Sequence, residues 1–257
     1  MAEVMRIAFL SGGAREKALR HLLENGENVC CVITPALSEK NRRFEKVVTT
    51  AIEFCIPVLP VKRDGLGAAL NLLKPDIVLS CGYPYVIDPH DVARARYVIN
   101  VHPTLLPKYR GYRSGPFVLI NGERKTGVTV HFLTEELDKG DIIVQREVDL
   151  TTFDTPKSVY RKCQAIEPAA VLDAIRLLKT GMAFGKPQDE SIASEYRQLR
   201  TPQDSAIDPN LPLIDLFNAI RACDPVDYPA FFFVEGQKVC IRLWRPDRPL
   251  LDGEDTI

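Results

Sequence analysis

Three polar residues near the middle of the chain are of the types that acyl-transfer chemistry needs. Asn100 and His102 lie two positions apart at the end of the apolar run 97–99, and Asp138 follows a second apolar strand pattern. In an extended strand, side chains two positions apart point the same way, so the amide and the imidazole would project together. Such a set supplies a partner for a developing oxyanion, a proton carrier and a carboxylate to tune it. We therefore predict that these three residues are catalytic and need no metal.

Each of these residues, taken alone, also has an ordinary structural explanation. A histidine near a strand end is usually a satisfied polar residue, and an aspartate in a stretch such as 138–141 is usually part of a turn. An asparagine ahead of a proline-containing loop is usually a cap or a turn residue. Only the set, with its spacing and intervening loop, favours a site.

Further motifs surround the three residues in a fixed order. They are Asn100-Val101-His102-Pro103, Leu105-Leu106-Pro107-Lys108-Tyr109-Arg110-Gly111, Thr126-Gly127-Val128-Thr129 and Asp138-Lys139-Gly140. This series resembles the formyltransferase family that uses N10-formyltetrahydrofolate, with Thr104 where that family usually has serine. The resemblance implies attack of a primary amine on the formyl carbon of that folate co-substrate. It also implies that Asn100 stabilises the oxyanion while His102 and Asp138 handle protons, without deciding which of the two accepts first.

The same resemblance implies two segments that clasp the flat pterin of the folate, mainly through backbone groups. The implied donor-binding residues are Tyr83, Tyr85, Val86, Ile87, Leu133 and Glu136. Whether the two tyrosines stack on the pterin or only pack stays open. His131, on the alternating strand pattern 128–132, is predicted to be structural rather than catalytic.

Two further segments are candidates for contacting the acceptor. Ser11 and Gly12 open the first helix, where free backbone N–H groups attract phosphate, although a plain tight turn is an equal alternative. The loop that leaves the Asn-His strand end is predicted to shape the mouth of the site, with positive charges that suit a phosphorylated ligand. Its alternative is a buried turn with a solvated tip. The implied contacts are Lys108, Tyr109, Arg110 and Gly111.

Strand and helix patterns alternate over the first hundred residues. Strands are predicted at 5–10, 28–33, 57–59, 76–80 and 97–101, and helices at 14–24, 40–54 and 66–73. This alternation predicts an α/β fold, a Rossmann-like, mostly parallel sheet flanked by helices. Strand patterns at 126–132 and 141–150 predict an antiparallel extension, followed by a long helix at 158–179.

The predicted organisation is a formyltransferase catalytic domain at 1–181, a linker at 182–212 and a small C-terminal α+β extension at 213–257. The extension would hold one helix at 213–223 and a β-hairpin at 228–244.

The composition is that of an ordinary globular protein. The chain has 257 residues, 46% of them hydrophobic and 26% charged, with a net charge of −1. No apolar run is long enough to span a membrane, and the first residues lack a secretory signal, so we expect a cytoplasmic enzyme with no membrane partner. Seven cysteines without a CxxC pair indicate free thiols in a reducing compartment.

The stretch after residue 180 bears on the acceptor. It is shorter than the barrel that the resemblance implies for the tRNA enzymes, and it carries more acidic than basic residues, which disfavours a polyphosphate partner. We therefore expect a nucleotide-sugar N-formyltransferase that acts on a dTDP-, GDP- or UDP-linked amino-deoxysugar for surface polysaccharide (O-antigen) biosynthesis. It would be a homodimer that binds no nucleic acid. The alternatives are a methionyl-tRNA formyltransferase and a non-catalytic formyl-folate binding protein.

Overall fold

The structure is a computed structural model that describes residues 4–36, 44–112, 114–182, 185–198 and 200–246. By packing, the chain forms two compact units. The first unit comprises 1–102, 128–146 and 164–190, and the second comprises 103–127, 147–163 and 191–257. The domain limits predicted from sequence follow the chain rather than this packing, and they stay a prediction.

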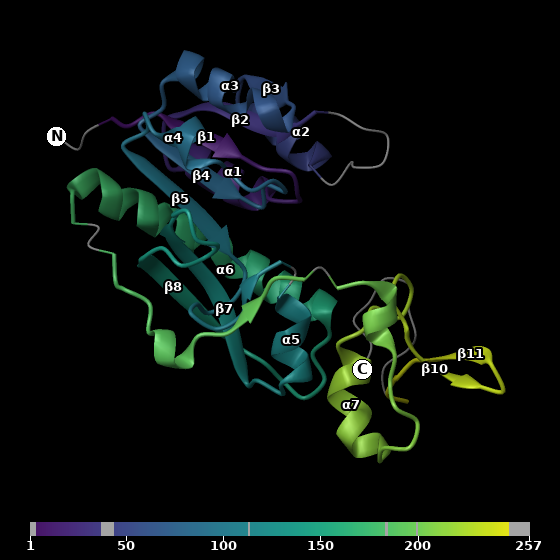
Figure 1. Cartoon of the computed structure of the whole chain (residues 1–257). Helices are drawn as coiled ribbons and strands as arrows, with labels where there is room; N and C mark the ends of the chain where they lie inside the picture. Colours follow the sequence, from purple (N-terminus) through teal and green to yellow (C-terminus); the bar gives the residue numbers. More distant parts are fainter. Residues whose placement is uncertain (1–3, 37–43, 113, 183–184, 199, 247–257) are drawn as a thin grey trace. The chain divides into compact units, whose positions relative to one another are not determined.

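A seven-stranded sheet is the main scaffold, with strand order β3-β2-β1-β4-β5-β7-β8 (Figure 1). Its strands are β1 (Ile7–Leu10), β2 (Val29–Pro35), β3 (Val58–Val61), β4 (Ile77–Cys81), β5 (Tyr97–His102), β7 (Lys125–Phe132) and β8 (Ile142–Asp149). Strands β1 to β5 pair in parallel, and β7 pairs antiparallel with β5. The predicted mostly parallel α/β fold is therefore confirmed.

Helices cover this sheet because its central strands β1 and β4 are buried on both faces. They are α1 (Glu16–Glu24), α2 (Glu45–Glu53), α3 (Leu66–Leu73), α4 (Pro89–Val92) and α6 (Pro156–Thr180). Alternate residues of β1 point to opposite faces, yet Ala8, Phe9 and Leu10 are all fully buried. The predicted helix 40–54 begins among residues outside the described ranges.

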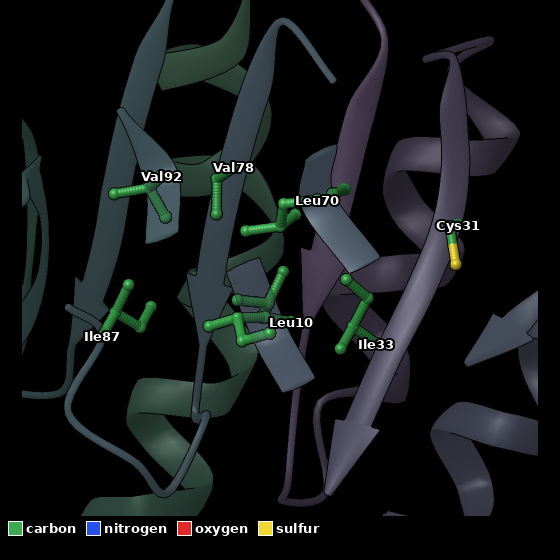
Figure 2. Packing of buried hydrophobic residues seen from close by; sticks show 9 residues of the cluster. Leu10, Cys31, Ile33, Leu70, Val78, Ile87 and Val92 are labelled. Atoms are coloured by element: carbon green, nitrogen blue, oxygen red, sulfur yellow. The ribbon is translucent and has the colours of Figure 1, made fainter. Parts of the chain in front are cut away.

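One hydrophobic cluster shows how the first unit packs (Figure 2). Leu10, Ile33 and Val78 from three neighbouring strands meet Leu70 of α3 and Val92 of α4. Burying each of these side chains contributes about 1.5–3 kcal/mol, so the cluster holds α3 and α4 against the three strands. No helix among the described residues has the length and apolar character to cross a membrane.

The second unit contains shorter elements. They are β6 (Arg110–Gly111), α5 (Gly115–Ile120), β9 (Glu195–Tyr196), α7 (Leu213–Arg221), β10 (Ala230–Val234) and β11 (Gln237–Ile241). Strands β10 and β11 form the expected antiparallel hairpin, and α7 lies within the predicted helix 213–223. Helices α4 and α5 were not predicted, because four and six residues are too few to show a helical period.

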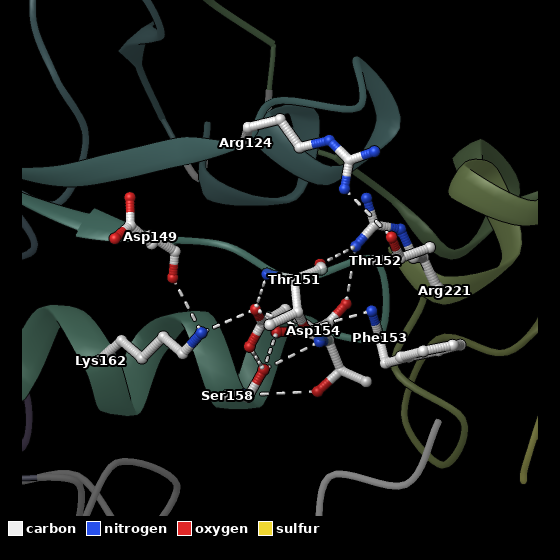
Figure 3. A network of polar contacts seen from close by, with 10 residues as sticks. Arg124, Asp149, Thr151, Thr152, Phe153, Asp154, Ser158, Lys162 and Arg221 are labelled. Carbon is white, nitrogen blue, oxygen red and sulfur yellow. Dashed lines mark hydrogen bonds and ion pairs between the residues drawn. The ribbon is translucent and has the colours of Figure 1, made fainter.

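A buried arginine organises the second unit (Figure 3). The guanidinium of Arg221 donates to the carbonyl oxygens of Leu119, Thr151 and Asp154 at 3.5, 3.3 and 3.1 Å. The carboxylate of Asp154 in turn accepts from Ser158 and Lys162, each at 2.7 Å. Arg221 therefore links α7 to α5 and to the loop that precedes α6.

Candidate active site

The three residues predicted to be catalytic gather in the first unit. Asn100 and His102 lie at the end of β5, where their register partners on β7 are His131 and Thr129. The Nδ1 atom of His102 lies 3.4 Å from Oδ2 of Asp138, and both side chains are 7% exposed. This pair can hold a proton in a site that is largely shielded from water, and the carboxylate can fix the orientation of the ring.

A tight loop presents the Asp138 carboxylate. Asp138 adopts a left-handed backbone conformation with φ of 55°, which aspartate tolerates better than most residues. Gly140 packs so closely that an added Cβ would lie 1.7 Å from the carbonyl oxygen of Phe132, so this position requires glycine. The N–H of Phe132 donates to the carbonyl oxygen of Asp141 at 2.9 Å, which closes the loop on the end of β7.

His131, predicted to be structural, belongs to this cluster. Its Nδ1 lies 2.8 Å from the carbonyl oxygen of Phe132, and because a carbonyl only accepts, Nδ1 must carry the proton. In the neutral ring, Nε2 is then an acceptor, and Nδ2 of Asn100 lies 3.2 Å from it. The same Nε2 lies 3.7 Å from Oδ1 of Asp138. His131 therefore fixes the amide of Asn100, a role that depends on strand register, which no local sequence signal reveals.

The glycine turn after β1 uses its backbone donors within the chain. The N–H of Ser11 donates to the carbonyl oxygen of Ile33 at 2.9 Å, and the N–H of Gly12 donates to the carbonyl oxygen of Gly82 at 3.0 Å. A Cβ on Gly12 would lie 2.5 Å from Pro84, so the turn packs tightly against the loop after β4. These donors do not form an open phosphate cradle, and acceptor contact by Ser11 and Gly12 stays a prediction.

The two segments predicted to hold the folate contact the same hydrophobic cluster. Tyr83 and Leu133 pack on the cluster of Figure 2, and Ile87 is itself a buried member of it. Tyr83 meets Tyr85 edge to face with ring centres 5.5 Å apart, and burial raises the pKa of Tyr83 to about 12. Tyr85 and Val86 are exposed. Contact of these residues with the pterin stays a prediction.

Glu136, the last of the predicted donor-binding residues, lies on the loop that presents Asp138. Its carboxylate pairs with Lys139, and its backbone carbonyl accepts from the Thr134 hydroxyl at 2.9 Å. The described residues contain no group of three His, Cys, Asp or Glu side chains that could hold a metal ion.

The loop predicted to contact the acceptor is engaged inside the second unit. The hydroxyl of Tyr109 donates to Glu123 at 2.9 Å, and Nζ of Lys108 lies 3.1 Å from the same oxygen. The Tyr109 ring stacks on Tyr196 at 5.8 Å, and burial raises the pKa of Tyr109 to about 12.

The next two residues of this loop are equally enclosed. Arg110 is 1% exposed and lies 3.8 Å from Glu195, and a Cβ on Gly111 would lie 2.2 Å from the carbonyl oxygen of Tyr196. The loop thus has an evident structural role. Contact of Lys108, Tyr109, Arg110 and Gly111 with an acceptor stays a prediction.

Comparison with known proteins gives consistent matches. Residues 5–175 match the family described as formyl transferase. The chain is 32% identical over 250 residues to a methionyl-tRNA formyltransferase of Pelotomaculum thermopropionicum, a match that covers 94% of this chain and 78% of that protein. It is 32% identical over 232 residues to the methionyl-tRNA formyltransferase of Thermotoga maritima, covering 86% and 73%. A 4-N formyltransferase from Francisella tularensis has a similar fold, with a TM-score of 0.74, 23% identity and coverage of 93% and 97%.

These relatives contradict the acceptor that the sequence analysis favoured. An amino-deoxysugar on a nucleotide was expected, but the matched curated relatives are named for methionyl-tRNA, and the solved 4-N formyltransferase is similar at the level of fold. The expectation rested on the short length and the summed charge of the stretch after residue 180. The summed charge hides a local excess of positive charge, because Lys238, Arg242 and Arg245 follow one another closely.

Proposed function

The chain belongs to the formyl transferase family, and from that premise we propose that it transfers the formyl group of N10-formyltetrahydrofolate to the amino group of methionyl-tRNA. The observation that carries the proposal is that curated relatives of that name align with most of this chain. The proposed acceptor replaces the earlier expectation that no nucleic acid binds. The homodimer stays a prediction, to be checked by light scattering.

Asn100 acts on the oxygen of the formyl group in this proposal. Its amide has two N–H bonds, and one of them is directed to Nε2 of His131. The other donates to the carbonyl oxygen as negative charge develops there. Since His131 fixes the amide before the reaction, no reorientation is needed when the charge appears, which is the condition for efficient electrostatic stabilisation.

His102 and Asp138 manage the proton of the attacking amine. The folate, when bound, would supply the formyl carbon. The amine must lose a proton as it bonds to that carbon, and N10 must gain a proton as its own bond to the carbon breaks. His102 can take this proton while Asp138, 3.4 Å away, stabilises the charged ring. The low exposure of both side chains keeps this charge pair out of bulk water, where it would be weak.

The direct test is a formylation assay. The purified chain is incubated with formyl-folate and methionyl-tRNA, and formylmethionyl-tRNA is measured. We expect formylation by the wild-type chain, its loss in His102→Ala, and unchanged rates in Asp64→Asn, a control on an exposed carboxylate. Binding of tRNA should weaken as salt rises, because phosphate contacts release counterions.

Two outcomes would contradict the proposal. A wild-type chain that binds formyl-folate but leaves methionyl-tRNA unmodified acts on another acceptor. Full activity of His102→Ala would show that the site does not perform the reaction.

A further inference from the structure

The segment that follows α6 returns to the loop that presents Asp138. The side chain of Gln188 lies there half-buried, and its Nε2 donates to the carbonyl oxygens of Asp138 and Gly140, each at 2.8 Å. One side-chain amide thus holds the backbone on both sides of Lys139. Both contacts lie in the first unit, together with His102.

Backbone contacts hold the same segment against the loop. Lys186 and Ile142 exchange two N–H to carbonyl hydrogen bonds, each 2.8 Å long. Gly185 permits the close approach, because a Cβ there would lie 2.4 Å from Cβ of Asp141. Residues 185–188 therefore form a clamp along the 138–142 loop.

The loop needs such support because its key residue has an unfavourable backbone conformation. Asp138 has a φ of 55°, which costs free energy for any residue with a Cβ and persists only when the surroundings enforce it. If the backbone relaxed, the carboxylate would leave its position 3.4 Å from Nδ1 of His102. Small displacements of a catalytic group lower rates steeply.

We propose that Gln188 is a positioning residue for formyl transfer, which acts by holding the backbone of Asp138 and so its carboxylate against His102. The activity test of this inference rests on the proposed function, because it uses methionyl-tRNA as acceptor. Gln188 lies in the stretch 182–212 that the sequence analysis predicts as a linker, so this stretch would contribute a positioning residue to the site.

A double-mutant cycle separates positioning from general stability. Gln188→Leu removes both donors, and Gln188→Glu keeps the shape but sets a carboxylate against two carbonyl oxygens. We expect each to lower kcat/KM roughly 10- to 100-fold. In an Asp138→Ala background, Gln188→Leu should have no further effect, because the group it positions is gone. Asn71→Leu makes a similar change on an exposed amide of α3, so it is the matched control and should keep wild-type activity.

Amide hydrogen exchange gives a readout that needs no acceptor. In Gln188→Leu, the amides of 138–142 should exchange faster than in the wild type, while those of β1 stay protected and report an intact fold. Unchanged exchange at 138–142, or an equal loss of activity in the Asp138→Ala background, would overturn the inference. If wild type fails to formylate methionyl-tRNA, the proposed function fails, and the exchange comparison still decides the role of Gln188.

Discussion

The Nδ2 atom of Asn100 lies 3.2 Å from Nε2 of His131, across the antiparallel pair of β5 and β7. The two residues are register partners, so their side chains emerge on the same face of the sheet. The other ring nitrogen of His131 is committed to the carbonyl oxygen of Phe132 at 2.8 Å. A histidine with its proton fixed in this way can only accept from Asn100 while it is neutral, which sets the direction of the amide.

His131→Phe should therefore impair catalysis although His131 need not touch the reacting atoms. Removing the acceptor frees the Asn100 amide to rotate, and we expect kcat/KM to fall roughly 10- to 100-fold in the formylation assay. His131→Gln should recover part of the loss, because its amide oxygen can still accept. His90→Ala, on an exposed histidine, is the control. Wild-type rates in His131→Phe would refute the orienting role.

Asp138→Asn tests the charge of the carboxylate without changing its size. The amide keeps the loop geometry but cannot stabilise a protonated His102 at 3.4 Å. Steady-state kinetics should show a loss of kcat of roughly 10²- to 10⁴-fold. Asp64→Asn makes the same change on an exposed carboxylate and should have no such effect. If Asp138→Asn worked as fast as the wild type, the proton-handling pair would have to be assigned elsewhere.

Local patterns predicted the elements that are long and apolar. Helix α3 occupies the residues expected for it, because an apolar run there ends shortly before Pro75. Asn100 and His102 were found because two-residue spacing on a strand is a local signal. The loop 138–140 was found because its aspartate and glycine stand in a family motif.

The remaining parts of the site depend on contacts between distant segments. His131 reaches Asn100 through the register of β5 and β7, and Gln188 reaches Asp138 across 50 residues. Neither separation leaves a periodic pattern in the sequence. At the glycine turn, a local motif was present but misleading. It suggested free N–H donors at Ser11 and Gly12, and in the structure both donate to backbone carbonyl oxygens of the chain.

Arg221→Met should destabilise the second unit. The buried guanidinium donates to three backbone carbonyl oxygens, and methionine would fill the space but leave those oxygens unsatisfied. We expect a loss of about 2–3 kcal/mol in the free energy of unfolding, measured by urea denaturation. Arg124→Met, which removes a more exposed hydrogen bond to Thr152, should cost less than about 0.5 kcal/mol. Equal midpoints for the two variants would mean that Arg221 is not a structural anchor.

Asp154 should make the stability of the chain depend on acid pH. Burial raises the pKa of this carboxyl group, but hydrogen bonds from Lys162, Ser158 and Thr151 outweigh burial and leave the pKa below its ordinary 3.8. A folded-state pKa below the unfolded value contributes stability that is complete above about pH 4 and is lost as the pH falls through the folded-state pKa. The free energy of unfolding of the wild type should therefore exceed that of Asp154→Asn most at neutral pH, and the difference should shrink below about pH 4. Urea titrations from pH 3 to pH 7 measure this difference. Asp64→Asn, on an exposed carboxylate, is the control. A difference that stays constant across this range would show that the Asp154 contacts do not favour its charged form.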